Sequence, residues 1–512
     1  MTSAISLGVP ACVGVTLLLA VGACTVGPDY ERPAAAVPAA YKEAPQTLAD
    51  WQVARPADAS ERGLWWAVFK DPVLDGLEQE IDISNQNLKA AEAAFRQAEA
   101  IVAQARAGYF PTATIDAQAQ RARTSGGRVG SIGVSGGNTG RISNLFSLST
   151  AASWVPDLWG KISRTVEGDV ATAQANASDV ANARLAAQGQ LASDYVQLRV
   201  TDELKRLLDA AVKAYAESLR ITQNQYDAGI AAASDVAQAR TQLESTEAQA
   251  IATGVLRAQL EHAIAVLIGK PPAELTIAPV ASVPALPVIP SGLPSTLLER
   301  RPDIASAERR MAAANAQIGV AEAAFFPIIT LSADYGVSAA TLNTLFNAAS
   351  RMWSVGATLA QTVFDAGARH ALVEQDRALL EAAVADYRQT VLTGFQQVED
   401  ELAALRILAE QAAAEDIAVA SSREAERIIF NQYKAGTVAY TNVVVAQTTA
   451  LTNAEAALTV RQSRLVASVA LIEALGGGWD SSQVPGREQI ESDSPLNFNP
   501  LPPADSWPKL WW

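Results

Sequence analysis

Cys24 is the residue whose neighbours point most directly to chemistry. The stretch 7–23, LGVPACVGVTLLLAVGA, is apolar and ends in small residues directly before this cysteine. Such a stretch is typical of a secretory signal that is cleaved at its small-residue end. The ending VGAC predicts that Cys24 begins the mature chain and carries a covalent lipid such as palmitate. One feature departs from the usual signal, because no Lys or Arg precedes Arg32.

The remaining reactive residue types point to no further chemistry. His262 and His370 are the only histidines, and neither has a cysteine nearby, which disfavours a metal site. The carboxylates of 399–401 lie on a predicted helix that needs solvated charge, although an acid–base pair there is an alternative. The glycine-rich stretch 126–141 lacks a following GK[ST] and joins two predicted strands, which favours a loop over a phosphate site. The sequence predicts no enzyme, no metal and no cofactor besides the lipid on Cys24.

Composition points to long, closely packed helices. Of the 512 residues 49% are hydrophobic, many of them alanine, and only 6% are aromatic. Proline is absent between Lys161 and Gly269 and between Ile328 and Val484, and spans of that length predict long helices. The net charge of −15 argues against nucleic acid as a partner, because phosphate binding needs a basic surface.

The chain contains an internal two-fold repeat. GYFPTATI (108–115) matches AFFPIITL (324–331), and a predicted helix with large residues every seven positions precedes each stretch. These large residues are Leu88, Phe95, Val102 and Tyr109 in one copy and Ile304, Met311, Ile318 and Phe325 in the other. Alanine occupies the second position of each seam, which lets neighbouring helices approach closely.

After each Phe-Pro the period of the pattern changes from helical to two. Polar and apolar residues alternate over 112–119, and Leu331, Ala333, Tyr335 and Val337 alternate with small or polar residues, which predicts strands with unlike faces. Returning strands are expected over 143–155 and 351–364. The matching corners PDLWGK and FDAGAR then lead into long helices. The second, from about Ala368 to Tyr433, would run about 100 Å at 1.5 Å per residue.

Two further corners, NQYDAG (224–229) and NQYKAG (431–436), end these long helices. Gly229 and Gly436 suit the left-handed position that closes a helix. The expected N-caps of the following helices are Ser234 and Thr441, with Asp235 and Asn442 in the first turn. Each corner is therefore predicted to be the tip of a helical hairpin.

The predicted strands require assembly. No apolar run beyond the signal reaches the 18 residues of a membrane-spanning helix. A mature chain that spans a membrane must then do so as a β-barrel, and four strands cannot close around a lumen. Three copies would supply twelve strands, although composition does not determine that number.

Three motifs carry a resemblance to a known family. CTVGPDYERP (24–33), RRPDIASAERRMAAANAQIGVAEAAFFP (300–327) and the paired NQYxAG corners resemble the TolC-type outer-membrane efflux lipoproteins, the NodT-like group of resistance–nodulation–division systems. The resemblance extends from Cys24 to about Gly478. It implies a mostly α-helical homotrimer, with a twelve-stranded transmembrane β-barrel in the outer membrane and a helical tunnel in the periplasm. The implied function is a passive exit duct for drugs or other small toxic compounds, and hence multidrug resistance.

The resemblance also implies partners and site residues. A periplasmic adaptor (a membrane fusion protein) would contact the hairpin tips and link them to the inner-membrane pump. The implied contact residues are Ala228, Gly229, Ile230, Ala435, Gly436 and Thr437. Asp235 and Tyr433 match positions of the closed periplasmic gate, and Asn442 is the third residue assigned to it.

The gate departs from the family pattern. Val438 replaces an arginine of the best-known member, and Asn442 and Val445 replace aspartates. Asp235 is then expected to pair with Tyr433 alone or with a backbone group. As alternatives, Asp235 serves only the helix N-terminus and Tyr433 only packs under its corner.

These patterns divide the chain into six parts. They are a signal peptide (1–23), a lipidated N-terminal extended segment (24–74), repeat 1 (75–270), a proline-rich equatorial linker (271–296), repeat 2 (297–478) and a C-terminal tail (479–512). The Trp-rich end of the tail, DSWPKLWW, is either an interface segment or disordered. Two alternative functions stay open: the outer-membrane channel of a type I protein-secretion system, and an envelope spacer that conducts nothing.

Overall fold

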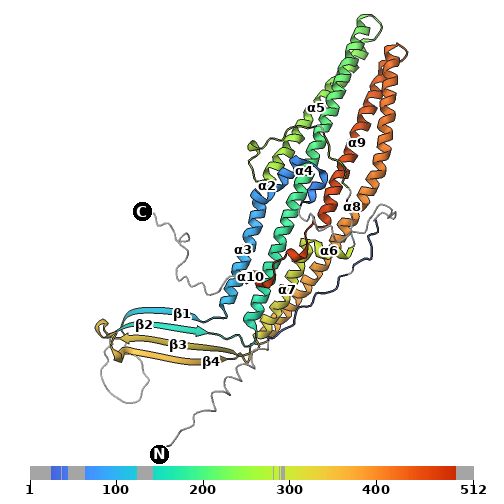
Figure 1. Cartoon of the computed structure of the whole chain (residues 1–512). Helices are drawn as coiled ribbons and strands as arrows, with labels where there is room; N and C mark the ends of the chain where they lie inside the picture. Colours follow the sequence, from blue (N-terminus) through green and yellow to red (C-terminus); the bar gives the residue numbers. More distant parts are fainter. Residues whose placement is uncertain are drawn as a thin grey trace, which may run out of the picture.

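The computed structural model describes residues 25–35, 37–43, 64–123, 142–280, 282–287, 289 and 294–491. Long helices stand side by side, and a four-stranded sheet lies at one end of them (Figure 1). The predicted signal, Cys24, the glycine-rich loop 126–141 and the Trp-rich end of the tail lie outside the described residues.

The two copies of the repeat are built from elements of matching length. A short turn, η2 (Trp65–Phe69), lies in the segment 24–74 that was predicted to be extended, and α2 (Pro72–Ser84) crosses the predicted boundary at 75. Repeat 1 continues with α3 (Gln86–Ala107), β1 (Thr112–Arg123), β2 (Ile142–Trp154), α4 (Lys161–Asp227) and α5 (Ala233–Leu267). In repeat 2 α6 (Pro294–Arg300) precedes α7 (Pro302–Ala323), β3 (Ile328–Ala339), β4 (Arg351–Ala360), α8 (Ala368–Lys434) and α9 (Tyr440–Ala474). Helices α4 and α8 have 67 residues each, and α5 and α9 have 35. The predicted internal repeat is confirmed.

Short elements complete the chain. A 3₁₀ turn, η3 (Pro272–Glu274), opens the linker between the repeats, and η4 (Leu342–Thr344) and η5 (Ala348–Ser350) join β3 to β4. After α9 the chain forms η6 (Ser481–Gln483) and α10 (Arg487–Ile490).

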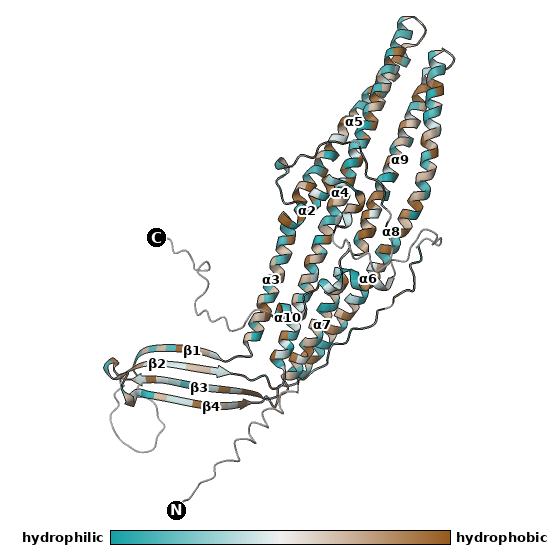
Figure 2. Ribbon diagram, viewed as in Figure 1, coloured by the Kyte–Doolittle hydropathy of each residue, from teal (hydrophilic) through white to brown (hydrophobic). Residues whose placement is uncertain are grey.

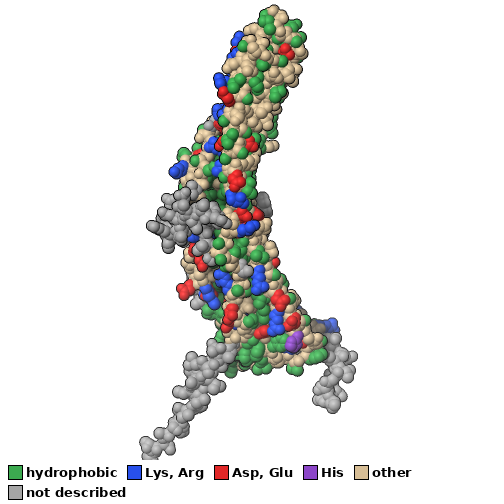
Figure 3. Space-filling view, turned by 90° about the vertical axis from the view of Figure 1, so that its right-hand side faces the viewer, with side chains coloured by type: hydrophobic (Ala, Val, Ile, Leu, Met, Phe, Trp, Pro, Cys, Tyr) green, Lys and Arg blue, Asp and Glu red, His purple; other side chains and the backbone are tan. Residues whose placement is uncertain are grey.

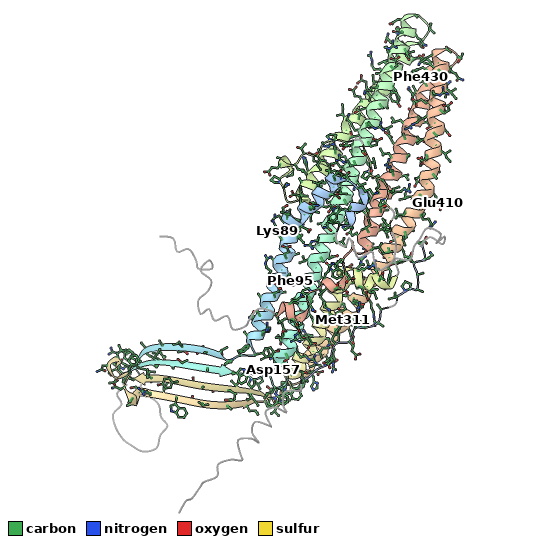
Figure 4. All side chains as sticks on the ribbon, viewed as in Figure 1. Lys89, Phe95, Asp157, Met311, Glu410 and Phe430 are labelled. Atoms are coloured by element: carbon green, nitrogen blue, oxygen red, sulfur yellow. The ribbon has the colours of Figure 1, made fainter. Side chains whose placement is uncertain are left out.

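The corners between sheet and long helices use the same device twice. Gly160 and Gly367 precede α4 and α8 with φ of 76° and 90°, a region that favours glycine. The Asp157 carboxylate accepts the N–H groups of Ile162 at 2.9 Å and Ser163 at 2.8 Å. Asp365 likewise accepts the N–H of Gly367 at 3.1 Å. Asp157 lies where the sheet meets the helices (Figure 4).

The sheet has antiparallel order β1-β2-β3-β4 and two unlike faces. One row across it consists of Ile115, Thr150, Tyr335 and Trp353, and the next row on the same face of Ala113, Ala152, Ala333 and Val355. The row between them, on the opposite face, consists of Thr114, Ala151, Asp334 and Ser354. Because side chains alternate along a strand, one face is largely apolar and the other largely polar. Hydrophilic and hydrophobic residues accordingly mix along β1 (Figure 2).

The helical part is held together by buried seams. Leu88, Val102, Ile304 and Met311 are at most 2% exposed, as the heptad pattern predicts. A larger core joins η2 and α2 to the middle of the hairpins. Its members include Trp66, Leu74, Ile81, Tyr195, Leu198, Ile264 and Leu465. Charged side chains spread along the helical part, whereas hydrophobic ones gather toward the end that carries the sheet (Figure 3).

One described helix corrects the expectation that no further segment could span a membrane. By length and composition alone, Ala233–Leu267 is long and apolar enough to do so. This helix is α5, which returns beside α4 as the second arm of a hairpin. Its outer side exposes Ile251 (70%) and Val255 (62%), so part of its apolar surface is free to pack against another helix.

Candidate functional site: the hairpin tips and the seam behind them

The two tips have the same backbone geometry. Gly229 and Gly436 both have φ of 74°, and a Cβ at either position would meet nothing within 4 Å, so conformation and not space requires glycine there. The N–H of Ile230 donates to Gln225 O at 2.8 Å, and the N–H of Thr437 donates to Gln432 O at 3.0 Å. These bonds close each long helix with a Schellman motif.

The side chains of the tips point to solvent. Ala228 and Ala435 are the C-cap residues of α4 and α8, and both are exposed. Ile230 is 74% exposed although it is strongly apolar. Both tips lie at the end of the molecule farthest from the sheet (Figure 1).

The helices after the tips begin earlier than predicted. Helix α5 begins at Ala233 with Ala232 as its N-cap, and α9 begins at Tyr440 with Ala439 as its N-cap, so the prediction of caps at Ser234 and Thr441 is wrong. An alanine has no side-chain acceptor. At the first tip Asp235 compensates, because its carboxylate accepts the N–H of Ala232 at 3.3 Å. A reciprocal bond of this kind starts a helix without a hydroxyl cap.

Tyr433 joins the two hairpins. Its side chain is 5% exposed, and its hydroxyl donates to Thr222 Oγ1 on α4 at 3.0 Å. Its ring meets Tyr440 edge to face with centroids 5.2 Å apart. Burial raises the pKa of Tyr433, and burial also raises the pKa of Tyr440 to about 12. Both phenols are therefore protonated at neutral pH and available as hydrogen-bond donors.

The three predicted gate residues make different contacts in the structure. Asp235 bonds to the backbone of Ala232, one of its two expected partners, while Tyr433 bonds to Thr222. Asn442 occupies the matching third position of α9 and is exposed. It lines a groove of about 410 Å³ between α8 and α9, together with Val438 and Val445.

Sequence reasoning missed a second polar contact behind Tyr433. Gln447 Nε2 on α9 donates to Ser218 Oγ on α4 at 3.0 Å, and the hydroxyl of Tyr215 donates to Gln447 O at 3.2 Å. All three side chains are at most 3% exposed. We name the set Tyr215, Ser218, Thr222, Tyr433 and Gln447 the inter-hairpin ladder. Its signal in the sequence is the spacing 215, 218 and 222, which places these residues on one face of α4.

Glu399, in the acidic run 399–401, holds another segment of the chain in place. Glu399 accepts the backbone N–H groups of Lys42 at 2.7 Å and Glu43 at 2.9 Å, and so holds the N-terminal segment against α8. Among the described residues, no group of three or more His, Cys, Asp or Glu side chains could hold a metal ion. His370 packs its ring edge to face against Phe325 at 5.0 Å.

The residues that follow Cys24 are fixed at the junction of sheet and helices. Val26 N–H donates to Trp159 O at 3.2 Å. The guanidinium of Arg164 donates to Val26 O and Gly27 O, both at 3.1 Å, and to Asp29 at 2.9 Å. Gly27 lies so close to Gly319 that a Cβ on it would stand 2.4 Å from the Gly319 Cα. This part of the N-terminal segment is thus clamped next to the corner at Gly160.

Comparison with known proteins identifies the group to which this architecture belongs. The family profile described as outer membrane efflux protein matches residues 77–270 and 293–477. The toluene efflux pump outer membrane protein TtgC of Pseudomonas putida is 30% identical over 478 residues, which are 93% of this chain and 96% of that protein. The pyoverdine export outer membrane protein OpmQ of Pseudomonas aeruginosa is 33% identical over 436 residues, 83% of this chain and 90% of that protein.

A solved structure agrees in fold. The outer-membrane channel OprN superposes with a TM-score of 0.79 at 30% identity, and the match covers 89% of this chain and all of that chain. The predicted fold class, a mostly helical chain that adds four strands to a membrane-embedded sheet, is confirmed by this likeness and by the described elements. Members of this group are transport conduits that use no cofactor. The chain therefore belongs to the outer membrane efflux protein family, and it is an outer-membrane channel component of an efflux system and not an enzyme.

Proposed function

We propose that three copies of this chain close into a channel that serves as a passive exit duct for drugs or other small toxic compounds. The observation that carries this proposal is the sheet, whose faces differ in polarity and whose outer strands β1 and β4 each have one partner among the described strands. An open edge in lipid leaves backbone groups unpaired at several kcal/mol each. Pairing β1 of one copy with β4 of the next removes every edge, and twelve strands form an even-numbered barrel.

The hairpin tips are the proposed contact with a periplasmic adaptor, a membrane fusion protein that connects this channel to an inner-membrane resistance–nodulation–division pump. The proposed contact residues are Ala228, Gly229, Ile230, Ala435, Gly436 and Thr437. Their support is the exposed apolar side chain of Ile230 and the open space around both glycines. The Ile230 side chain is therefore accessible to another protein.

The periplasmic gate is proposed at the same end, with Asp235, Tyr433 and Asn442. Tyr433 has the strongest support, because its buried bond to Thr222 ties α8 to α4. Separation of the hairpins would break that bond. Asp235 and Asn442 stand at matching helix starts, where a neighbouring copy could meet them.

A lipid on Cys24 is the proposed anchor in the outer membrane. The clamp formed by Arg164 holds residues 26–29 beside the root of the sheet. A cysteine directly before this segment would carry its acyl chains next to the sheet, where lipid lies. A single acyl chain binds membranes only weakly, so the barrel and the lipid would act together.

Deletion of the gene tests the duct. We expect sensitisation to dyes, detergents, drugs or solvents, restored by the wild-type chain. Two relatives named for toluene efflux and for pyoverdine export support a small-molecule cargo. Unchanged tolerance across a broad panel would count against the proposal, and loss of a secreted toxin or protease without sensitisation would favour the type I secretion alternative. Absence of ion current from purified protein in planar bilayers, even with opened tips, would favour the spacer.

A further inference from the structure

A groove of about 500 Å³ lies between the two hairpins, away from the tips. It is formed by α4, α8 and α9 and bordered by Leu286 of the linker. Four arginines line it, from three helices: Arg206, Arg423, Arg461 and Arg464. They face only two carboxylates, Glu203 and Asp416, although the whole chain has a net charge of −15. The groove is therefore locally positive, although the chain as a whole is negatively charged.

Two of the four guanidinium groups are already engaged. Arg206 forms an ion pair with Glu203 one turn earlier on α4. Arg461 donates to the backbone oxygens of Val283 at 3.0 Å and Pro284 at 3.4 Å, which fixes the linker along the groove. These contacts shape the wall of the groove and hold its rim in place.

The other two guanidinium groups are less engaged among the described residues, and Arg423 has an electrostatic interaction with Glu426 on the same helix. Neither Arg423 on α8 nor Arg464 on α9 forms a hydrogen bond or an ion pair within the described part of the chain. The Nε of Arg464 is also shielded from solvent. A buried N–H of a charged group that is left unpaired is costly, at about 1–3 kcal/mol or more. An acceptor supplied from outside would remove that cost.

The groove opens on the face that carries the N-terminal segment and the linker. Tyr41 and Leu297 share one apolar cluster on this face, and Ile289 of the linker packs against that cluster and against the larger core around Tyr195. Glu43 pairs with Arg406 of α8 at 2.7 Å, less than two turns from Ala412 at the groove. If the N-terminal segment leads to a lipid outside the barrel, as proposed above, this face is the outer wall of the tunnel.

We propose that this groove is a binding site for carboxylate groups on the outer wall of the tunnel, with Arg423 and Arg464 as its principal ligands. The planar guanidinium fork matches a carboxylate in a bidentate manner, which a lysine cannot do. Among the side chains that line the groove, four guanidinium groups and two carboxylates give a net charge of +2, which two ligand carboxylates would neutralise. The carboxylates come either from an acidic peptide segment or from a free polycarboxylate.

The test is a titration of the full-length, detergent-purified protein with hexaglutamate and, separately, with citrate, followed by isothermal calorimetry at low salt. We expect saturable binding that weakens as salt is added, because exposed charges are screened. The double variant Arg423→Gln/Arg464→Gln should bind at least ten-fold more weakly. The pair Arg423→Lys/Arg464→Lys, which retains the charge but not the fork, should lie between the two.

The matched control is Arg240→Gln/Arg388→Gln, which removes two exposed arginines outside the groove. It should bind within two-fold of the wild type. Hexaglutamate binding ten-fold tighter than citrate identifies an acidic peptide as the source, and comparable or tighter citrate binding identifies a free polycarboxylate. No saturable binding of either probe, or an equal loss in the control, would overturn the site.

The outcome is distinguishable from failure of the proposed duct. Bilayer conductance measured on the same preparations reports the channel alone, so conducting protein that binds neither probe refutes only the groove. The location of the groove on the outer wall of the tunnel rests on the proposed lipid anchor. To test this location, hexaglutamate is added to only one side of membrane-inserted channels in each experiment. Protection of the groove arginines from phenylglyoxal by hexaglutamate only from the side of the tips supports the outer wall, and protection only from the barrel side contradicts it.

Discussion

At the scale of single residues, the hairpins are joined by neutral hydrogen bonds and not by charges. Tyr433 reaches Thr222 and Gln447 reaches Ser218, and both contacts are buried. Buried neutral bonds of this kind contribute about 0.5–1.5 kcal/mol each and are insensitive to salt. Opening of the tips should accordingly depend little on ionic strength.

Removal of the Tyr433 hydroxyl should loosen the closed state. We expect Tyr433→Phe to raise the open probability about five-fold in planar bilayers, since a loss of about 1 kcal/mol shifts an equilibrium by that factor. Thr222→Val should act alike, and the double variant should be less than additive because both changes remove one bond. Asp235→Ala serves as a comparison. If it alone opens the channel and Tyr433→Phe does not, the ladder has no part in the gate.

Glu78 gives the chain a pH-dependent stability. It is fully buried and neither carboxylate oxygen has a partner among the described residues. Burial, followed by the nearby charges of Asp82 and Asp75, raises its pKa from 4.5 to about 9. Between these values the folded chain retains a proton that the unfolded chain has released. Stability should therefore fall as pH rises through this window, by at most about 1.4 kcal/mol per pH unit.

Glu78→Gln should abolish most of that slope. We expect its thermal unfolding midpoint to exceed that of the wild type at pH 8 and to approach it at pH 5. Glu80→Gln, a change on the same helix at a half-exposed ion pair with Lys270, should leave the slope intact. Parallel curves for wild type and Glu78→Gln would show that Glu78 stays charged in the folded chain.

At the scale of elements, the connections between the strands and the long helices determine how the sheet and the helices are oriented. Asp157 and Asp365 each bind the backbone at the start of a 67-residue helix, and a glycine with positive φ precedes each helix. Both 67-residue helices start from such a corner, directly after the strands β2 and β4. The corners therefore set the direction of the tunnel relative to the sheet.

Asp157→Ala should destabilise the corner before α4. It removes acceptors for two backbone N–H groups and for the Ser163 hydroxyl, and losses of this kind cost about 1–2 kcal/mol. Thermal unfolding in detergent measures the change. The control Asp209→Ala, which removes an exposed pair with Lys205 on the same helix, should have a much smaller effect. Equal effects of the two changes would contradict a special role for the corner.

At the scale of the whole molecule, the chain is an incomplete wall. The edge strands of its sheet are β1 and β4, and its helical layer exposes apolar side chains on α5. In the proposed trimer, neighbouring copies pair with these strands and cover these side chains. The internal repeat gives each chain two similar strand pairs, and closure of the barrel repeats the same kind of pairing between copies. In the proposed trimer, β4 of one copy pairs with β1 of the next, as β2 pairs with β3 within the chain.

Cysteine cross-linking tests the closure. Thr114→Cys on β1 combined in turn with Ser354→Cys, Gly356→Cys or Thr358→Cys on β4 should give, at one register, a ladder that ends at three chains on a denaturing gel. Thr114→Cys with Ala151→Cys, which face each other within one chain, should give no ladder. Only monomers for all three pairs, or a ladder beyond three chains, would contradict a closed trimer.

The sequence by itself determined the features that depend on neighbours along the chain. Period two over 112–119 and 331–337, the absence of proline, the corner glycines and the duplicated Phe-Pro motifs predict the strands, the long helices and their repetition. Helix α8, predicted from about Ala368 to Tyr433, is observed at Ala368–Lys434. Even here the helix starts after both tips were misplaced. At the first tip a carboxylate inside the helix binds the backbone in place of the expected hydroxyl cap.

Only the tertiary structure decided which distant side chains meet. Tyr433 lies 211 positions from Thr222, and Glu399 binds backbone 357 positions away. The groove arginines come from three helices of both repeats. Such contacts depend on the relative rotation and register of packed helices, which the pattern along any one helix leaves open. Whether a segment forms a helix or a strand depends on interactions between residues near each other in the chain. Which polar side chains pair depends on how the helices pack.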